Sequence, residues 1–109
     1  MMPPNLDIRP AEWQIVRALL ERHLPGSEVW AFGSRATGRA KPYSDLDLAI
    51  LGSQPLPLST LAELTDDFSE SDLRFKVDIV DWATTSPRFR KIIEAERVVV
   101  QGPAATDTV

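Results

Sequence analysis

The chain has 109 residues, no cysteine, one histidine and a formal net charge of −4 at pH 7. A disulfide framework, a thiolate zinc site and a cysteine nucleophile are therefore excluded, and any metal ion must be held by oxygen ligands. The acidic balance argues against direct nucleic-acid binding and favours small anions or a protein partner.

No apolar run approaches the roughly 20 residues that cross a bilayer, and the N-terminal stretch MMPPNLDIRP lacks the apolar core of a secretory signal. We therefore expect a soluble, cytoplasmic protein with no membrane association. The length fits one domain, which we expect to span residues 1–102, followed by a flexible C-terminal tail over residues 103–109.

The first predicted element is an amphipathic helix over residues 10–24. Its apolar residues recur at helical spacing: Trp13, Val16, Leu19, Leu20 and Leu24. Pro10 suits the first turn of this helix and Gly26 suits its C-terminal cap. A short apolar strand is predicted over residues 28–34, and residues 35–40 can form only a short helix or a loop.

A second strand is predicted over residues 45–51. In its sequence DLDLAIL, leucine or isoleucine occupies every second position from 46 to 50. Successive side chains of a strand point to opposite faces of the sheet. One face therefore carries Leu46, Leu48 and Ile50, and the other carries Asp45, Asp47 and Ala49.

The second half of the chain continues the alternation of helix and strand. Ser59 is a candidate N-cap for a helix whose apolar stripe comprises Leu61, Leu64 and Phe68. A third strand is predicted over residues 76–82. A last helix over residues 86–97, capped by Ser86, is expected to direct Phe89, Ile92 and Ile93 inward. The stretch RVVVQG can add a closing strand.

The predicted order is therefore α-β-α-β-α-β-α, with a closing strand as a further option. This order indicates a small mixed β-sheet of three to four strands backed by helices, in the α+β (α/β) range. The connection of about ten residues between the first two strands is short for a helical crossover and long for a tight hairpin. A mixed sheet is therefore favoured over a purely parallel one.

The two aspartates of the second strand need a positive partner. Side chains two residues apart on a strand are roughly 6 to 7 Å apart at the backbone, which suits carboxylates that flank paired metal ions about 3.5 to 4 Å apart. Asp78, in the sequence VDIVD of the third strand, can join Asp45 and Asp47, and Asp81 must point to the other face. The alternative is that the carboxylates face solvent and are balanced by nearby arginine and lysine residues.

Gly33 and Ser34 form a turn that can approach an anion. A glycine at this position lets backbone N–H groups reach a phosphate, and Ser34 adds a hydroxyl at the start of a helix, where the helix dipole favours negative charge. Together with the carboxylates, this turn describes a site for metal-assisted phosphoryl or nucleotidyl transfer.

The chain resembles the nucleotidyltransferase fold of the DNA polymerase beta superfamily. Gly33-Ser34, ten intervening residues and Asp45-Leu46-Asp47 reproduce the Gly-Ser and Asp-x-Asp signature of that family, and Asp78 lies where its third carboxylate is expected. The chain is most similar to the minimal nucleotidyltransferases, which are commonly antitoxins paired with a HEPN-domain ribonuclease toxin. The resemblance implies transfer of AMP from ATP to a tyrosine of such a toxin, with release of pyrophosphate.

The resemblance also implies roles for individual residues. Gly33 and Ser34 would bind the triphosphate, and Asp45 and Asp47 would hold two magnesium ions. Asp78 would bind the catalytic magnesium ion and could accept the proton of the attacking tyrosine.

Three further residues are weaker candidates for the nucleotide site. Arg35 and Arg39 are expected to contact phosphate or the partner, because of their charge and proximity. Ser44 either contacts phosphate or caps the strand, and we favour the second reading.

Two other classes of function stay open at this point. The chain could be a non-catalytic antitoxin that neutralises its toxin by steric binding, or a nucleotidyltransferase that modifies a small molecule or RNA. The absence of an acceptor-binding domain argues against the small-molecule and RNA readings. Trp82, at the end of the third strand, is expected to be partly exposed near the site, where it could anchor a partner.

Overall fold

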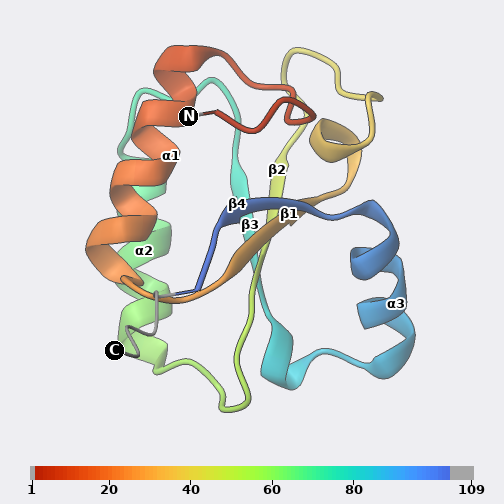
Figure 1. Cartoon of the computed structure of the whole chain (residues 1–109). Helices are drawn as coiled ribbons and strands as arrows, with labels where there is room; N and C mark the ends of the chain where they lie inside the picture. Colours follow the sequence, from red (N-terminus) through yellow and green to blue (C-terminus); the bar gives the residue numbers. More distant parts are fainter. Residues whose placement is uncertain (1, 104–109) are drawn as a thin grey trace, which may run out of the picture.

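The computed structural model describes residues 2–103, which form a four-stranded β-sheet with helices on both faces (Figure 1). The helices are α1 (Pro10–His23), α2 (Leu58–Ser69) and α3 (Pro87–Glu96), and the strands are β1 (Val29–Phe32), β2 (Leu46–Ile50), β3 (Val77–Asp81) and β4 (Val98–Gln101). Two short 3₁₀ helices, η1 (Ser34–Ala36) and η2 (Trp82–Thr84), follow β1 and β3. Of the predicted tail, only Pro103 is among the described residues.

The strands are arranged in the order β3-β2-β1-β4, and the sheet is mixed. Strand β1 pairs antiparallel with both β2 and β4, whereas β2 and β3 are parallel. A parallel pair needs a long crossover, and α2 supplies it. The predicted mixed sheet and the closing strand are both confirmed.

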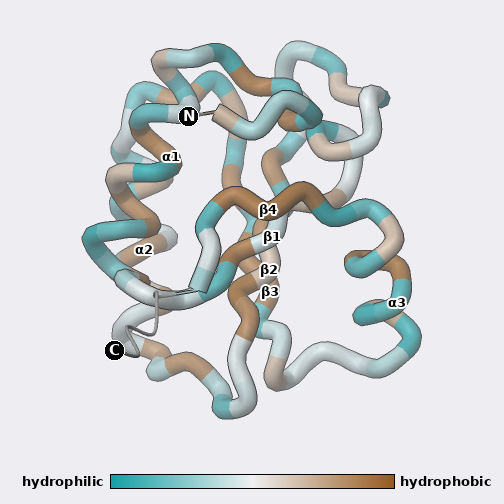
Figure 2. The backbone as a smooth tube through the Cα atoms, in the orientation of Figure 1, coloured by the Kyte–Doolittle hydropathy of each residue, from teal (hydrophilic) through white to brown (hydrophobic). Residues whose placement is uncertain are grey.

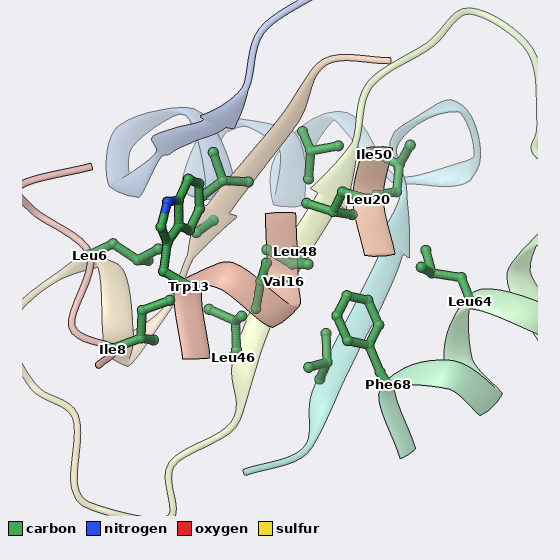
Figure 3. Packing of buried hydrophobic residues seen from close by; sticks show 14 of the residues in the cluster. Leu6, Ile8, Trp13, Val16, Leu20, Leu46, Leu48, Ile50, Leu64 and Phe68 are labelled. Carbon is green, nitrogen blue, oxygen red and sulfur yellow. The ribbon is translucent and has the colours of Figure 1, made fainter. Parts of the chain in front are cut away.

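The main core fills the space between one face of the sheet and helices α1 and α2, which lie on the left in Figure 1. Leu46, Leu48 and Ile50 of β2 are almost completely buried there and pack around Val16 and Leu20 of α1 (Figure 3). The strands run through the middle of the molecule as largely apolar segments (Figure 2). Burying one such side chain contributes about 1.5 to 3 kcal/mol, so this face sets the register of β2.

The opposite face of the sheet is covered in part by α3. A smaller apolar cluster of Phe32, Ala49 and Ile93 joins α3 to β1 and β2. The predicted inward position of Ile92 is wrong, because 48% of this residue is exposed. A helix that packs on a sheet buries one stripe of its side chains, and in α3 the buried residue is Ile93. The adjacent residue, Ile92, therefore lies outside the buried stripe.

Two helix boundaries differ from the predicted ones. Helix α2 begins at Leu58, and Pro57 occupies the N-cap position with a φ of −57°, so Ser59 lies inside the first turn. Helix α1 ends at His23, and Leu24 occupies its C-cap position in place of Gly26. Ser86 does cap α3, because its hydroxyl accepts a hydrogen bond from the Phe89 amide at 3.2 Å.

The N-terminal segment before α1 is part of the core. Leu6 and Ile8 are buried against the side of the sheet covered by α1, as Figure 3 shows. The Asp7 amide donates to the Arg35 carbonyl at 2.8 Å, which ties this segment to η1. Across residues 2–103, no helix combines the length and the apolar character needed to cross a bilayer.

Candidate active site

Three aspartates lie on the face of the sheet that α3 leaves partly open. Asp47 in β2 and Asp78 in β3 are direct partners across the parallel pair, so their side chains point to the same side. Asp45 immediately precedes β2, and it is close enough to Asp47 for its charge to act on that carboxylate. The alternation therefore places the apolar core on one face of β2 and a carboxylate cluster on the other.

Asp47 is the carboxylate with the most perturbed environment. Its pKa is raised from 3.8 to about 6, first because the side chain is desolvated and then because Asp78, Asp45 and Glu96 add negative charge around it. Two exposed cations pair with its neighbours: Lys76 Nζ lies 3.8 Å from an Asp78 oxygen, and Arg39 Nη2 lies 3.4 Å from a Glu96 oxygen. The cluster thus carries more negative charge than its neighbours neutralise.

Position 33 requires glycine for two reasons, its backbone conformation and the closeness of Asp47. Its φ of +76° lies in the left-handed region, which residues with a Cβ atom rarely adopt. A Cβ atom built on Gly33 would also lie 2.2 Å from Asp47 Oδ2, which is closer than any real contact. The turn after β1 and the central carboxylate of β2 are therefore packed directly against each other.

Ser34 opens η1 immediately after Gly33, as the sequence predicts, but η1 has only three residues. A helix this short adds little dipole, so its attraction for an anion comes from individual N–H and O–H groups rather than from a macrodipole. The Thr37 hydroxyl and the Ala36 amide both donate to the Gly33 carbonyl, at 2.9 and 3.1 Å, and hold the turn in shape.

The position of Arg35 does not fit the predicted phosphate contact. Only 2% of Arg35 is exposed, and its guanidinium donates to the backbone carbonyls of Asp7, Ser44, Lys41 and Pro42 at 2.8 to 3.2 Å. It also lies 4.1 Å from the centre of the Phe75 ring. Arg35 therefore points into the protein and joins the N-terminal segment to the loop before β2.

Arg39 and Ser44 occupy different surroundings. Arg39 is exposed beside η1, where its Nε donates to the Thr37 hydroxyl at 2.9 Å, so it is close to Gly33 and accessible. The Ser44 hydroxyl accepts a hydrogen bond from the Lys41 amide at 2.8 Å, which closes the turn before β2. This contact agrees with the capping reading of Ser44.

Asp81 and Trp82 lie at the end of β3, beyond Asp78. Asp81 faces the other side of the sheet from Asp78 and accepts hydrogen bonds from the amides of Ala83 and Leu56, at 3.2 and 2.9 Å. Trp82 is partly exposed, as predicted, and packs edge-on against Trp30. Three residues of β3 lie between Asp78 and Trp82, a spacing of about 13 Å along an extended strand. Trp82 also packs against the small apolar cluster beneath α3, and its closeness to the site stays a prediction.

Glu96, the last residue of α3, is a site residue that the sequence motifs do not reveal. Its Oε1 accepts a hydrogen bond from the Gly33 amide at 3.0 Å, although the two residues are 63 positions apart. Its Oε2 lies 3.4 Å from Arg39 Nη2. No spacing rule connects the end of α3 to the turn after β1, because only the packing of α3 on the sheet brings them together.

The donor set fits a divalent cation such as magnesium. Carboxylate oxygens are its preferred protein ligands, and a positive ion would relieve the repulsion that raises the pKa of Asp47. Within residues 2–103, no three His, Cys, Asp or Glu side chains converge closely enough to enclose an ion by themselves. Magnesium usually keeps several water or phosphate ligands, so two or three protein carboxylates on an open face are sufficient.

Comparison with known families identifies the same region of the chain. Residues 15–103 match the family model described as "Polymerase beta, Nucleotidyltransferase". The chain is also 52% identical over 97 residues to a probable protein adenylyltransferase, MntA, of Haemophilus influenzae, and the match covers 89% of this chain and 85% of that protein.

Solved structures share the arrangement of strands and helices. A crystal structure of a toxin–antitoxin complex with AMP-PNP contains a chain with a TM-score of 0.70 and 25% identity, covering 84% of this chain and 74% of that one. A structure of the tri-AMPylated HEPN toxin of Shewanella oneidensis in complex with MNT antitoxin has a TM-score of 0.66 and 22% identity, covering 87% and 73%. The family match over residues 15–103 includes the four strands, the Gly33 turn and the three aspartates. By sequence and by fold, this chain belongs to the polymerase beta nucleotidyltransferase family.

Proposed function

We propose that the protein is an antitoxin that transfers AMP from ATP to a tyrosine of a HEPN-domain ribonuclease toxin. One observation carries the proposal: Asp47 and Asp78 are paired across β2 and β3, and Asp47 packs directly on Gly33. This arrangement joins a carboxylate cluster, suited to a metal ion, to a turn that can bind phosphate.

The nature of the acceptor is supported by the relatives. The H. influenzae protein is named a probable protein adenylyltransferase, and the S. oneidensis complex contains an AMPylated HEPN toxin. An adenylyltransferase of this kind would act in the cytoplasm, where ATP is available. The net charge of −4 is consistent with a protein acceptor and unfavourable for RNA.

Each residue of the site would have a distinct task. The Gly33 amide and the Ser34 hydroxyl donate hydrogen bonds to the triphosphate, and Arg39 is placed to neutralise its charge. Asp45 and Asp47 would hold magnesium, with two ions expected, and Asp78 would complete the set of protein ligands. Bound magnesium supplies charge neutralisation of the phosphates and lowers the pKa of the attacking hydroxyl.

The transfer then requires little further chemistry from the protein. The tyrosine oxygen forms a bond with the α-phosphorus while the bond to the β-phosphate breaks and pyrophosphate leaves. Asp78, on the edge strand β3, would accept the tyrosine proton. The protein contributes mainly the position of the reacting groups and the compensation of charge.

The test is intact-mass measurement of the HEPN toxin from the same locus after incubation with magnesium and ATP. We expect the toxin to gain the mass of one or more AMP groups with the wild-type protein and none with Asp45→Asn/Asp47→Asn. The matched control is Asp66→Asn/Asp72→Asn, which makes the same chemical change at two exposed positions and should transfer AMP at the wild-type level.

Two results would contradict the proposal. If the toxin binds tightly but its mass never changes, neutralisation is steric and the protein is not an adenylyltransferase for that acceptor. If both double variants lose transfer equally, the loss reflects folding or overall charge rather than the carboxylate cluster.

A further inference from the structure

Glu96 connects two groups that are positioned to bind phosphate. Its Oε1 accepts a hydrogen bond from the Gly33 amide at 3.0 Å, and its Oε2 lies 3.4 Å from Arg39 Nη2. The two donors flank η1, with Gly33 before it and Arg39 after it. About a quarter of the Glu96 side chain is exposed, so the contact is accessible from solvent.

A carboxylate and a phosphate compete for donors of this kind. Both are anions whose oxygens accept hydrogen bonds from amide N–H and guanidinium groups. The Gly33 amide has one proton, which points to Glu96 in this conformation. A nucleotide phosphate can therefore use this amide only after the Glu96 carboxylate has moved away.

The surroundings of Glu96 make that movement easy. It is the last residue of α3, where the helix dipole disfavours negative charge. It also faces the aspartate cluster: after burial, Asp78 and Asp45, the charge of Glu96 is a further cause of the raised pKa of Asp47. Finally, it borders an open hollow of about 690 Å³ between the N-terminal segment, η1 and the start of β4, which can receive the displaced side chain.

We propose that Glu96 occupies the phosphate-binding donors of the empty enzyme and is displaced by the triphosphate. The inference rests on the proposed function, since it assumes that the nucleotide binds at the Gly33 turn. It adds a residue that lowers nucleotide affinity and keeps Arg39 and the Gly33 amide in place between turnovers. When pyrophosphate leaves, the carboxylate returns to both donors, so it competes with the leaving product for the same groups.

The test measures the dissociation constant of AMP-PNP in the presence of magnesium by calorimetry. Glu96→Gln removes the charge and keeps an acceptor oxygen, whereas Glu96→Ala removes the contact. The matched control is Glu94→Gln, the same change at an exposed position on the same helix. We expect about fivefold tighter binding for Glu96→Ala, an intermediate effect for Glu96→Gln and the wild-type value for Glu94→Gln.

The amide resonance of Gly33 gives a second readout that does not depend on the nucleotide. In ¹H–¹⁵N spectra of the free protein, it should move in Glu96→Ala and stay unchanged in Glu94→Gln. If the contact is only structural, the Glu96 variants should bind AMP-PNP more weakly than the wild type, which would overturn the inference.

The remaining outcomes separate the inference from the function on which it rests. Equal tightening in the Glu94 and Glu96 variants would reveal a general charge effect and overturn the inference alone. Failure of every protein, wild type included, to bind AMP-PNP would overturn the proposed nucleotide site and the inference with it.

Discussion

At the scale of single residues, the charge of Asp47 lowers the free energy of unfolding, and its proposed role as a metal ligand accounts for a carboxylate at this position. It is packed on Gly33 and paired with Asp78. Burial raises its pKa to about 6, with further contributions from the negative charges of Asp78, Asp45 and Glu96. A carboxyl whose pKa is higher in the folded than in the unfolded chain binds protons more tightly when folded. In metal-free protein, ionised Asp47 therefore destabilises the fold.

Asp47→Asn should accordingly stabilise the metal-free protein at pH 7.5. Allowing for screening by solvent, we expect a gain of about 1 kcal/mol in the free energy of unfolding, or a rise of roughly 4 °C in Tm. The gain should shrink as the pH falls through about 6 towards 4, because Asp47 of the wild type then becomes protonated.

The measurement is thermal unfolding in the presence of a chelator, with exposed Asp66→Asn as the control. A loss of stability at pH 7.5 would show that the charge of Asp47 is already compensated within the protein. Added magnesium should raise the Tm of the wild type and leave that of Asp47→Asn almost unchanged.

At the scale of elements, Arg35 organises the connection from β1 to β2. Its guanidinium donates hydrogen bonds to the carbonyls of four residues from two segments of the chain. Burial lowers the pKa of Arg35 from its usual value, but its carbonyl partners still favour the charged form. Arg35 thus joins the loop that precedes the Asp45–Asp47 pair to the N-terminal segment.

Arg35→Met should therefore destabilise the protein. We expect a loss of about 2 to 3 kcal/mol in the free energy of unfolding, since several carbonyls lose their donor at once. The same change at exposed Arg39 should cost less than about 0.5 kcal/mol and weaken nucleotide binding instead. Denaturant unfolding and AMP-PNP binding are measured for both variants. If Arg35→Met is as stable as the wild type but binds AMP-PNP poorly, Arg35 contacts phosphate as the sequence predicts.

The contrast between these two arginines shows which features of the site can be predicted from the sequence and which cannot. Alternation in DLDLAIL predicts β2 and the orientation of its carboxylates, because a two-residue period has only one way to bury leucines. Whether an arginine near a Gly-Ser turn faces inward depends on where the N-terminal segment and Phe75 lie, and local spacing carries no such information. The same limit applies to Glu96, whose partner Gly33 is 63 residues away.

At the scale of the whole molecule, an ion pair between Glu12 and Arg74 links α1 to the segment that leads into β3. Glu12 of α1 is 5% exposed and accepts hydrogen bonds from the Arg9 amide and from Arg74 Nη2, both at 2.9 Å. The hydrogen bond with Arg74 is the main cause that lowers the pKa of Glu12 from 4.5 to about 2. A lowered carboxyl pKa stabilises the fold above pH 4.5, and the stabilisation is lost as the pH falls towards 2.

Glu12→Gln should lower the free energy of unfolding at pH 7 by about 2 kcal/mol. The difference from the wild type should narrow between pH 4.5 and 2, as the wild-type carboxyl becomes protonated. Urea unfolding over this pH range provides the measurement, with Glu21→Gln on the exposed face of α1 as the control. A difference that is constant with pH would assign the effect to packing rather than to charge.

The position of β3 at the border of the sheet has a consequence for the kind of acceptor that can be admitted. Among residues 2–103, no strand lies beyond β3, so Asp78 stands at an open flank rather than at the bottom of a cleft. A phenol carried on the surface of a large body can approach this flank sideways, without passing between two layers. A small diffusible acceptor would find few walls there to hold it, so an open border selects for acceptors that bring their own means of attachment.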